Sequence, residues 1–308
     1  MFSVKILLFF LPFFLMVVAE DQPIGEISVS NANFGNKLYQ IISKDDENKI
    51  FSPISVHAAL SLAYQGASGD TAEGFRKVLN IPVAKSAADG YKTVMNDLNN
   101  IQNVTLHVAN KIYIQEDYKL KESFRTVATD YFYSDTETVN FVDNIVSANK
   151  INHWVQNKTN DKITNLISPD DLNSFTCLVL VNAIYFKGDW KEAFPEKLTR
   201  VEPFYVSDTK TVDCQMMHIQ SYFGYANDNE LDAQLLKLPY QNENVNLVII
   251  LPNKRDGINE LERKLTNKSL TTLTKRMYQT EVKVSLPKFK IESTIQLNEP
   301  LQKVIINV

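Results

Sequence analysis

The sequence predicts an α+β fold, in which helices pack on a large sheet of mixed or antiparallel strands. Apolar residues recur at helical spacing through much of the first half of the chain, whereas residues 201–251 have the pattern of strands. Between these regions, residues 178–186 form a short apolar run that is typical of a buried strand. The 308 residues are 44% hydrophobic and contain no internal repeat or low-complexity linker, so we expect a single domain.

The N-terminus has the layout of a secretory signal peptide. One positive charge precedes the apolar residues 6–18, and the small side chains of Val17 and Ala19 suit cleavage after Ala19. The apolar stretch is shorter than the roughly 20 residues that a membrane span needs. We therefore expect residues 1–19 to be removed and residues 20–308 to form a secreted, extracellular domain without a membrane anchor.

Three Asn-x-Ser/Thr motifs fit an extracellular setting, at Asn103, Asn157 and Asn267. Each motif is weak by itself, because such triplets arise by chance in an Asn-rich chain. Asn103 and Asn267 stand in loop-like sequence and are the better candidates for glycosylation.

The remaining elements follow from hydrophobic periodicity and capping residues. Helices are expected at residues 30–42, 53–64, 71–79, 87–98, 119–133, 143–158 and 256–274. Ser30 or Asn31 can cap the first helix, Pro53 suits the first turn of the second, and Asp70 or Thr71 can cap the third. Strands are expected at residues 48–52, 104–115, 136–141, 178–186, 222–225, 234–238, 245–251, 281–286 and 288–297.

The run at residues 178–186 organises the expected fold. Every position is apolar except Asn182, and a half-solvated strand would instead alternate with polar residues. The run therefore predicts a central strand that is covered on both faces. An unpaired buried amide costs about 1–3 kcal/mol, so Asn182 is expected to have hydrogen-bond partners.

Charge and cysteine content argue against a nucleic-acid-binding protein and against a disulfide-built scaffold. The net charge is −4 and no basic stripe stands out, so nucleic acid is not an expected partner. Two cysteines, Cys177 and Cys214, are too few for a disulfide-built scaffold. Their spacing leaves open whether they pair, and we favour free thiols.

The sequence lacks the usual signs of an enzyme. There is no His-Glu-x-x-His motif, and residues 66–69 are one glycine out of register with a Gly-x-Ser-x-Gly elbow. The nine glycines form no phosphate-cradling loop, and Arg76 with Lys77 indicates a solvated helix face. We expect no catalytic residue, metal or cofactor. The histidines are expected to be surface or hydrogen-bonded core residues: His57, His107, His153 and His218.

An ordered series of motifs from about Asn31 to the last residue resembles the serpins. The matching residues are Asn48, Ser52-Pro53, Ser55, Gly66-Ala67, Gly69, Thr71-Ala72, Val108-Ala109-Asn110, Ile151-Asn152, Trp154-Val155, Thr159-Asn160, Lys162-Ile163, 178–188, Trp190, Thr199, Phe204, Met216-Met217-His218, Leu238-Pro239-Tyr240 and 286–289. One such motif would be weak, but the whole series in order indicates the serpin fold, with a sheet A and further sheets B and C.

The resemblance implies a function and a set of site residues. Serpins inhibit serine proteases: an exposed reactive-centre loop is cut as bait and inserts as a new strand into sheet A, driven by relaxation of a metastable fold. Residues 178–186 resemble the strand beside the insertion site. The polar cluster called the shutter would comprise Asn48, Ser52, Ser55 and Asn182, and the breach, where insertion begins, would comprise Trp190, Thr199 and Phe204.

The resemblance also implies that residues 1–308 lack part of the family's fold. No counterpart is found for the strand called 5A, the hinge, the reactive-centre loop or the final strands, so no reactive-site bond or target protease can be assigned. We expect these residues to be inactive as an inhibitor of serine proteases. The alternative is a non-inhibitory secreted binding or decoy protein on a serpin scaffold.

Without strand 5A, residues 178–186 would lack one neighbour. Strands lie about 4.8 Å apart, so the expected structure has either an open slot or direct antiparallel pairing of residues 288–297 with 178–186. An open apolar edge of this kind also predicts aggregation or self-association.

Overall fold

The computed structural model describes residues 8–9, 22–43, 48–207, 209–266, 268, 270–291, 295, 297 and 299–301. The chain divides into two compact units, which are described separately. The helix-rich unit contains residues 22–34 and 52–187. The strand-rich unit contains residues 8–9, 35–51 and the described residues from Gly188 onward.

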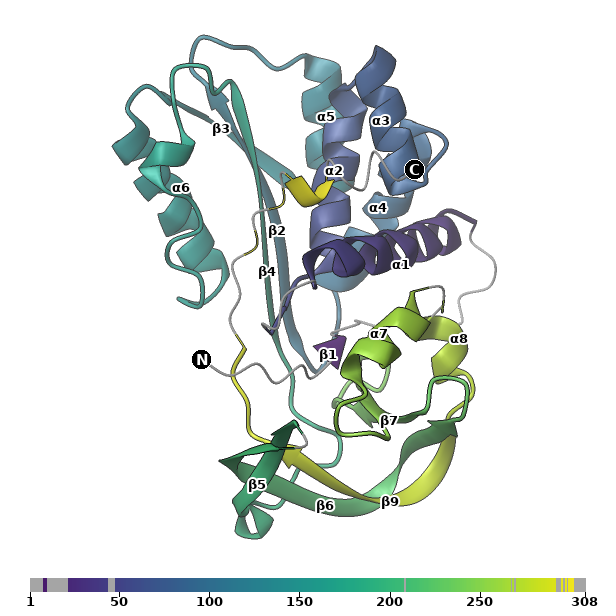
Figure 1. Cartoon of the computed structure of the whole chain (residues 1–308). Helices are drawn as coiled ribbons and strands as arrows, with labels where there is room; N and C mark the ends of the chain where they lie inside the picture. Colours follow the sequence, from purple (N-terminus) through teal and green to yellow (C-terminus); the bar gives the residue numbers. More distant parts are fainter. Residues whose placement is uncertain are drawn as a thin grey trace. The chain divides into compact units, whose positions relative to one another are not determined.

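The helix-rich unit is built on a sheet with strand order β3-β2-β4, in which β2 is parallel to β3 and antiparallel to β4. Its strands are β2 (Thr105–Gln115), β3 (Ser134–Val139) and β4 (Leu178–Lys187). Its helices are the first part of α1 (Gln22–Ile42), α2 (Pro53–Gly66), α3 (Gly69–Leu79), α4 (Ala84–Asn99), α5 (Glu122–Phe132), α6 (Asn144–Lys158) and the short η1 (Pro169–Asp171). Figure 1 shows α6 on one face of this sheet and α2, α4 and α5 on the other.

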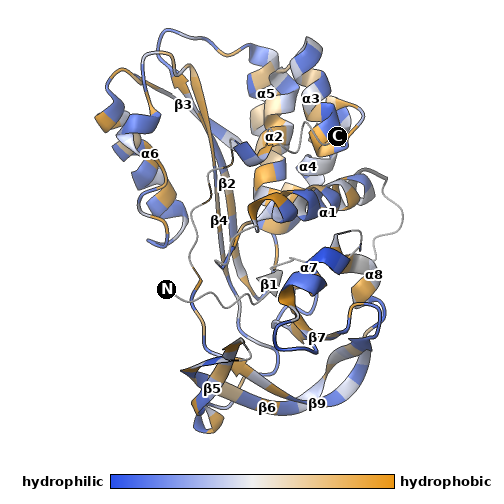
Figure 2. Ribbon diagram, in the orientation of Figure 1, coloured by the Kyte–Doolittle hydropathy of each residue, from blue (hydrophilic) through white to orange (hydrophobic). Residues whose placement is uncertain are grey.

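Hydrophobicity decides which faces of these elements are buried. Ile151 and Val155 of α6 pack against Val181 and Ala183 of β4 in one apolar cluster. Figure 2 shows α2 pale to orange along its length, whereas α6 carries both blue and orange residues. The buried residues of α2 include Ala58, Leu62 and Tyr64.

The N-terminus of α2 agrees with its sequence signals. Ser52 is the N-cap, its hydroxyl accepts the N–H of Ser55 at 3.3 Å, and Pro53 occupies the first turn. The prediction for α1 is wrong at its start, because the helix begins at Gln22 rather than near Ser30. Ser30 is not a cap but a buried residue inside the helix.

The strand-rich unit is organised around one long strand. Its strands are β1 (Leu8–Phe9), β5 (Arg200–Ser207), β6 (Lys210–Asp228), β7 (Ala233–Pro239), β8 (Asn246–Pro252) and β9 (Tyr278–Pro287). Its helical segments are the last part of α1, η2 (Glu196–Leu198), α7 (Ile258–Leu265) and α8 (Leu270–Thr274). The described strands follow the order β1-β8-β7-β6-β5, and β9 also pairs with β6. Because β6 pairs successively with β5, β9 and β7 along its length, it connects strands that would otherwise belong to separate sheets.

Several predicted elements in this unit differ from the structure. Residues 48–52 form no strand, and the single helix expected at 256–274 is two helices, α7 and α8. Residues 288–291 of the strand expected at 288–297 have no regular structure, and positions 292–294 and 296 lie outside the described residues. The proposed pairing of this segment with β4 is therefore absent from the described residues.

Two further sequence expectations can be compared with the structure. Both cysteines are free, with Cys177 exposed and Cys214 half-buried, as we favoured. None of the helices in the described ranges is both long enough and apolar enough to cross a membrane. Most of the expected signal peptide, residues 1–19, lies outside the described residues.

Candidate functional site

The free edge of β4 is the most distinctive feature of the helix-rich unit. The N–H of Gln115 donates to the carbonyl of Cys177 at 3.0 Å, and the antiparallel register pairs Ile114 with Leu178. Residues 115 and 177 therefore face each other as a hydrogen-bonded pair. Because such pairs alternate along an antiparallel ladder, the odd-numbered residues of β4 bond to β2 through their backbones.

The even-numbered residues of β4 consequently direct their N–H and C=O groups away from β2. Leu180, Asn182 and Ile184 have these groups on the open edge, and no strand of the described residues pairs there. Helices lie on both faces of this sheet, but β4 is an edge strand among the described residues rather than the central strand that its composition predicts, and only Val181 and Ala183 are buried. Their neighbours in β4 are half-buried or exposed, because no neighbouring strand covers the open edge of β4.

Asn182 lies opposite Asn110 in the ladder and is bonded to it. The pair occupies a position without backbone hydrogen bonds, where side chains approach most closely. Asn182 Nδ2 donates to Asn110 Oδ1 at 2.6 Å, and Asn110 Nδ2 donates to the carbonyl of Phe132 at 2.9 Å. The expected partner of Asn182 thus exists. Its own Oδ1, however, is buried and accepts no hydrogen bond within the described structure.

Only some of the other residues of the expected shutter lie close to one another. Ser52 and Ser55 lie together at the start of α2, both half-buried, in the same unit as Asn182. No hydrogen bond joins either serine to Asn182 among the residues described. Asn48 belongs to the strand-rich unit, where its Oδ1 is buried without a partner. The assignment of these four residues to a shutter remains a prediction.

The expected breach residues all belong to the strand-rich unit. Trp190 stacks on Tyr240 with ring centroids 4.4 Å apart, and the two residues form an isolated antiparallel bridge. Burial raises the pKa of Tyr240. Thr199 follows η2, and Phe204 lies on β5 opposite Val212. The described residues show no hydrogen bond or ring contact from Thr199 or Phe204 to Trp190, so the breach also remains a prediction.

Sequence reasoning missed an ion-pair cluster that ties α6 to the sheet. Glu137 of β3 binds Lys111 of β2 at 2.7 Å and Lys150 of α6 at 2.8 Å. The hydrogen bond from Lys111 is the largest cause that holds the pKa of Glu137 below its usual value, and the hydrogen bond from Lys150 is the second. Lys111 also lies 5.7 Å from the ring centre of Trp154, on α6. The pairing of β2 with β3 and the position of α6 beside them bring these residues together, so their spacing in the sequence carried no signal.

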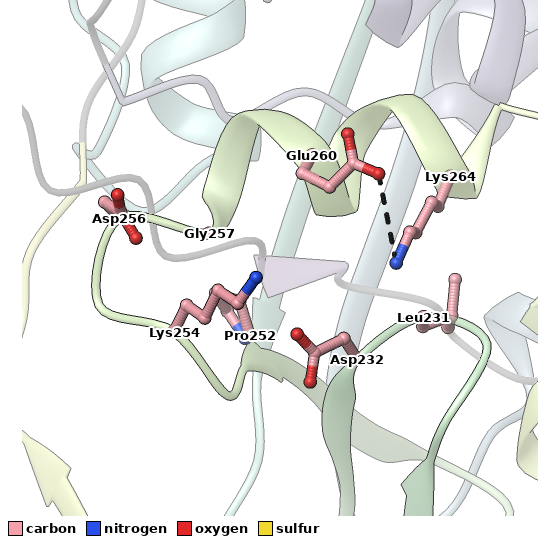
Figure 3. A pocket seen from close by; sticks show the side chains of 8 residues that line it. All are labelled: Leu231, Asp232, Pro252, Lys254, Asp256, Gly257, Glu260 and Lys264. Atoms are coloured by element: carbon pink, nitrogen blue, oxygen red, sulfur yellow. Dashed lines mark ion pairs between the residues drawn. The ribbon is translucent and has the colours of Figure 1, made fainter.

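The strand-rich unit also contains a surface hollow of about 350 Å³ (Figure 3). It is lined by Leu231, Asp232, Pro252, Lys254, Asp256, Gly257, Glu260 and Lys264. Within it, Glu260 binds Arg263 at 2.6 Å and Lys264 at 3.9 Å. In the described parts of the chain, no group of three or more potential metal ligands occurs.

Comparisons with known proteins agree with the fold and with the motifs. The family model described as "Serpin (serine protease inhibitor)" matches residues 29–307. Antichymotrypsin-2 of Bombyx mori is 38% identical over 280 residues, which are 90% of this chain and 75% of that protein. Antitrypsin of Bombyx mori is also 38% identical over 280 residues, again 90% of this chain but 71% of that protein.

Solved structures give the same result. The structure described as "Cleaved Serpin 42Da" superposes with a TM-score of 0.88 at 35% identity, and the match covers 91% of this chain and 76% of that one. Emu ovalbumin superposes with a TM-score of 0.86 at 26% identity, over 91% of this chain and 78% of its own. The predicted α+β serpin fold is confirmed. The chain belongs to the serpin family, a family of serine protease inhibitors rather than enzymes.

Proposed function

We propose that this protein acts in serine protease inhibition by accepting an additional strand along the open edge of β4. The observation that carries the proposal is the buried, unpartnered Oδ1 of Asn182 beside the outward-facing backbone groups of Leu180 and Ile184. An added strand would pair with these backbone groups, and each hydrogen bond formed would contribute about 0.5–1.5 kcal/mol. A donor on that strand would also satisfy Asn182.

We further propose that a polypeptide of residues 1–308 alone does not trap proteases. These residues supply the receiving sheet, but no counterpart of the reactive-centre loop is found among them. Incubation with trypsin-, chymotrypsin- and elastase-like proteases should leave the proteases active and give no SDS-stable complex. An active inhibitory serpin serves as the positive control. A covalent complex formed by residues 1–308 would contradict this part of the proposal.

A chimera tests the receiving sheet itself. Residues 1–308 can be followed by the corresponding C-terminal quarter of Bombyx mori antitrypsin, the relative that shares 38% identity. We expect the folded chimera to form an SDS-stable complex with trypsin. A cooperatively folded chimera that trypsin merely cleaves, without a covalent complex, would contradict the proposal of strand insertion beside β4.

We propose that the protein is secreted after removal of residues 1–19. The support is the apolar stretch followed by small residues at Val17 and Ala19. Expression in insect cells should release a protein whose first residue is Glu20, as determined by N-terminal sequencing. Retention inside the cells with an intact N-terminus would contradict secretion.

Among the sequons, we propose Asn103 as the glycosylated one. Asn103 is exposed in the loop before β2, with a φ of 61° that favours a turn. Asn157 lies within α6, and the hydroxyl of Thr159 is buried and donates to the Val155 carbonyl at 2.8 Å. Asn267 lies outside the described residues. Asn103→Gln should remove a glycan-dependent mass shift that Asn157→Gln leaves in place; the reverse result would contradict the proposal.

A further inference from the structure

His57 lies at the meeting point of four helices in the helix-rich unit. It belongs to α2 and its side chain is fully buried. Ser30 of α1, Tyr91 of α4 and the carbonyl of Leu79, the last residue of α3, all lie within hydrogen-bond distance. The ring of Phe34 in α1 packs edge-on at 5.4 Å. One side chain thus contacts every helix of the cluster α1–α4.

The hydrogen bonds assign the proton of the neutral ring. The hydroxyl of Ser30 donates to the carbonyl of Leu79, one of the carbonyls that the end of α3 leaves without a helical partner. Because a hydroxyl has one proton, Ser30 Oγ can only accept from His57 Nε2–H, 3.0 Å away. Nδ1 is then the acceptor, and it receives the hydroxyl proton of Tyr91 at 2.7 Å.

A second proton on His57 would disrupt this arrangement. Nδ1 would become a donor facing the Tyr91 hydroxyl, which would have to turn its own proton toward another acceptor such as Ser61 Oγ, 3.4 Å from Nδ1. The positive charge would also be buried, which is costly without a partner of opposite charge.

The groups that face His57 provide no such partner. They are Ser30 and Phe34 from α1, Ser61 from α2, the Leu79 carbonyl from α3 and Tyr91 from α4. Tyr91 is the titratable one, and burial raises its pKa well above the ordinary value, so it stays neutral. Burial lowers the pKa of His57 to about 4, opposed by the Leu79 carbonyl, with no charged side chain among the causes.

We propose that His57 is a pH-sensitive pin, which holds α2 against α1, α3 and α4 while it is neutral and releases them when it is protonated. The same helix begins at the Ser52 cap and carries Ser55, so the pin fixes the element that presents both serines. Acidification therefore loosens the helix cluster that supports the sheet carrying β4.

The direction of the pH effect follows from linkage. The pKa of His57 is lower in the folded protein than the usual 6.5 of an exposed histidine, so the unfolded chain binds the proton more tightly. The contribution of the neutral pin is fully present above pH 6.5 and is lost as the pH falls toward 4. At pH 4.5 the folding equilibrium constant should have dropped roughly 75-fold from this group alone, for pKa values of 6.5 and about 4.

The test compares His57→Gln with His107→Gln in the full chain. Glutamine retains one donor and one acceptor but does not titrate, and His107 is an exposed residue of β2 outside the cluster. The folding equilibrium constant, measured by urea unfolding from pH 7.5 to 4.5, should fall in the wild type and in His107→Gln. In His57→Gln the factor by which it falls should be tens of times smaller. An unchanged pH dependence in His57→Gln would overturn the proposal.

A measurement on the wild type tests the proposed role of His57 even where His57→Gln fails to fold. The NMR signal of the His57 ring should retain the neutral form down to about pH 5, well below the usual histidine pKa of about 6.5. A His57 ring that titrates near 6.5 in the folded protein would show that protonation carries no penalty and would overturn the proposal.

Discussion

Leucine substitutions at Asn110 and Asn182 should have unequal effects on stability, although the two residues are hydrogen-bonded to each other. Asn110 is 6% exposed and makes two hydrogen bonds, one with Asn182 and one to the Phe132 carbonyl at the end of α5. Asn110→Leu would leave both Asn182 Nδ2 and the Phe132 carbonyl unpaired. With about 1–3 kcal/mol for each of the two unsatisfied groups, we expect the free energy of unfolding to fall by about 2–6 kcal/mol.

Asn182→Leu should be much milder. It leaves Asn110 Oδ1 unpaired, at a cost of about 1–3 kcal/mol, but it also removes the Asn182 Oδ1 that is already buried without a partner. The two effects are of opposite sign and similar size, so the free energy of unfolding should change by no more than about 1 kcal/mol. Replacing both residues would show how strongly they are coupled.

Urea unfolding monitored by the fluorescence of Trp154, the tryptophan of the helix-rich unit, measures both variants under the same conditions. We expect Asn110→Leu to have a much lower free energy of unfolding than both Asn182→Leu and the wild type. If Asn182→Leu costs as much as Asn110→Leu, then Asn182 Oδ1 has a partner in solution and the reasoning about the open edge is refuted.

Two further substitutions test local features of the helix-rich unit. Ser52→Ala removes the cap of α2 and should lower the free energy of unfolding by about 0.5–2 kcal/mol, measured by urea unfolding; a neutral result would mean that the bond to the Ser55 N–H is not formed. Glu137→Gln removes a carboxylate whose pKa is depressed by Lys111 and Lys150, so it should lower stability at pH 7 by about 0.5–1 kcal/mol. Since a depressed carboxylate pKa stabilises only above the unfolded-state pKa, this difference should shrink as the pH falls below 4.5; a difference that persists there would contradict the ion-pair explanation.

The sequence was most informative where local chemistry decides the structure. The Ser52-Pro53 pair placed the start of α2 correctly, because a cap and a proline act within one turn. The order of motifs indicated the serpin fold, which the comparisons confirm. Alternation of apolar residues also located β2 within one residue of its observed start.

The errors arose where distant residues compete with local signals. Ser30 resembles a helix cap, but its hydroxyl instead binds the carbonyl of Leu79 in another helix. The composition of the run at 178–186 predicts a central strand, but β4 is an edge strand among the described residues, and only the missing counterpart of strand 5A indicated the absent neighbour.

For the site residues too, the sequence indicated local features but not contacts between distant positions. Asn182 was identified from its apolar surroundings, but its partner Asn110 follows only from the register of β2 and β4. The network around His57 joins positions separated by up to 49 residues, so the sequence could predict a hydrogen-bonded core histidine but not which groups it contacts.

Amide hydrogen exchange along β4, measured residue by residue by NMR on residues 1–308, tests the open edge most directly. Val179, Val181 and Ala183 bond to β2 and should exchange slowly, whereas Leu180, Asn182 and Ile184 face the open edge and should exchange much faster. This alternation is the result that the account predicts. Equal, strong protection of both sets would show that another strand already covers β4, and it would contradict a sheet that is free to accept one.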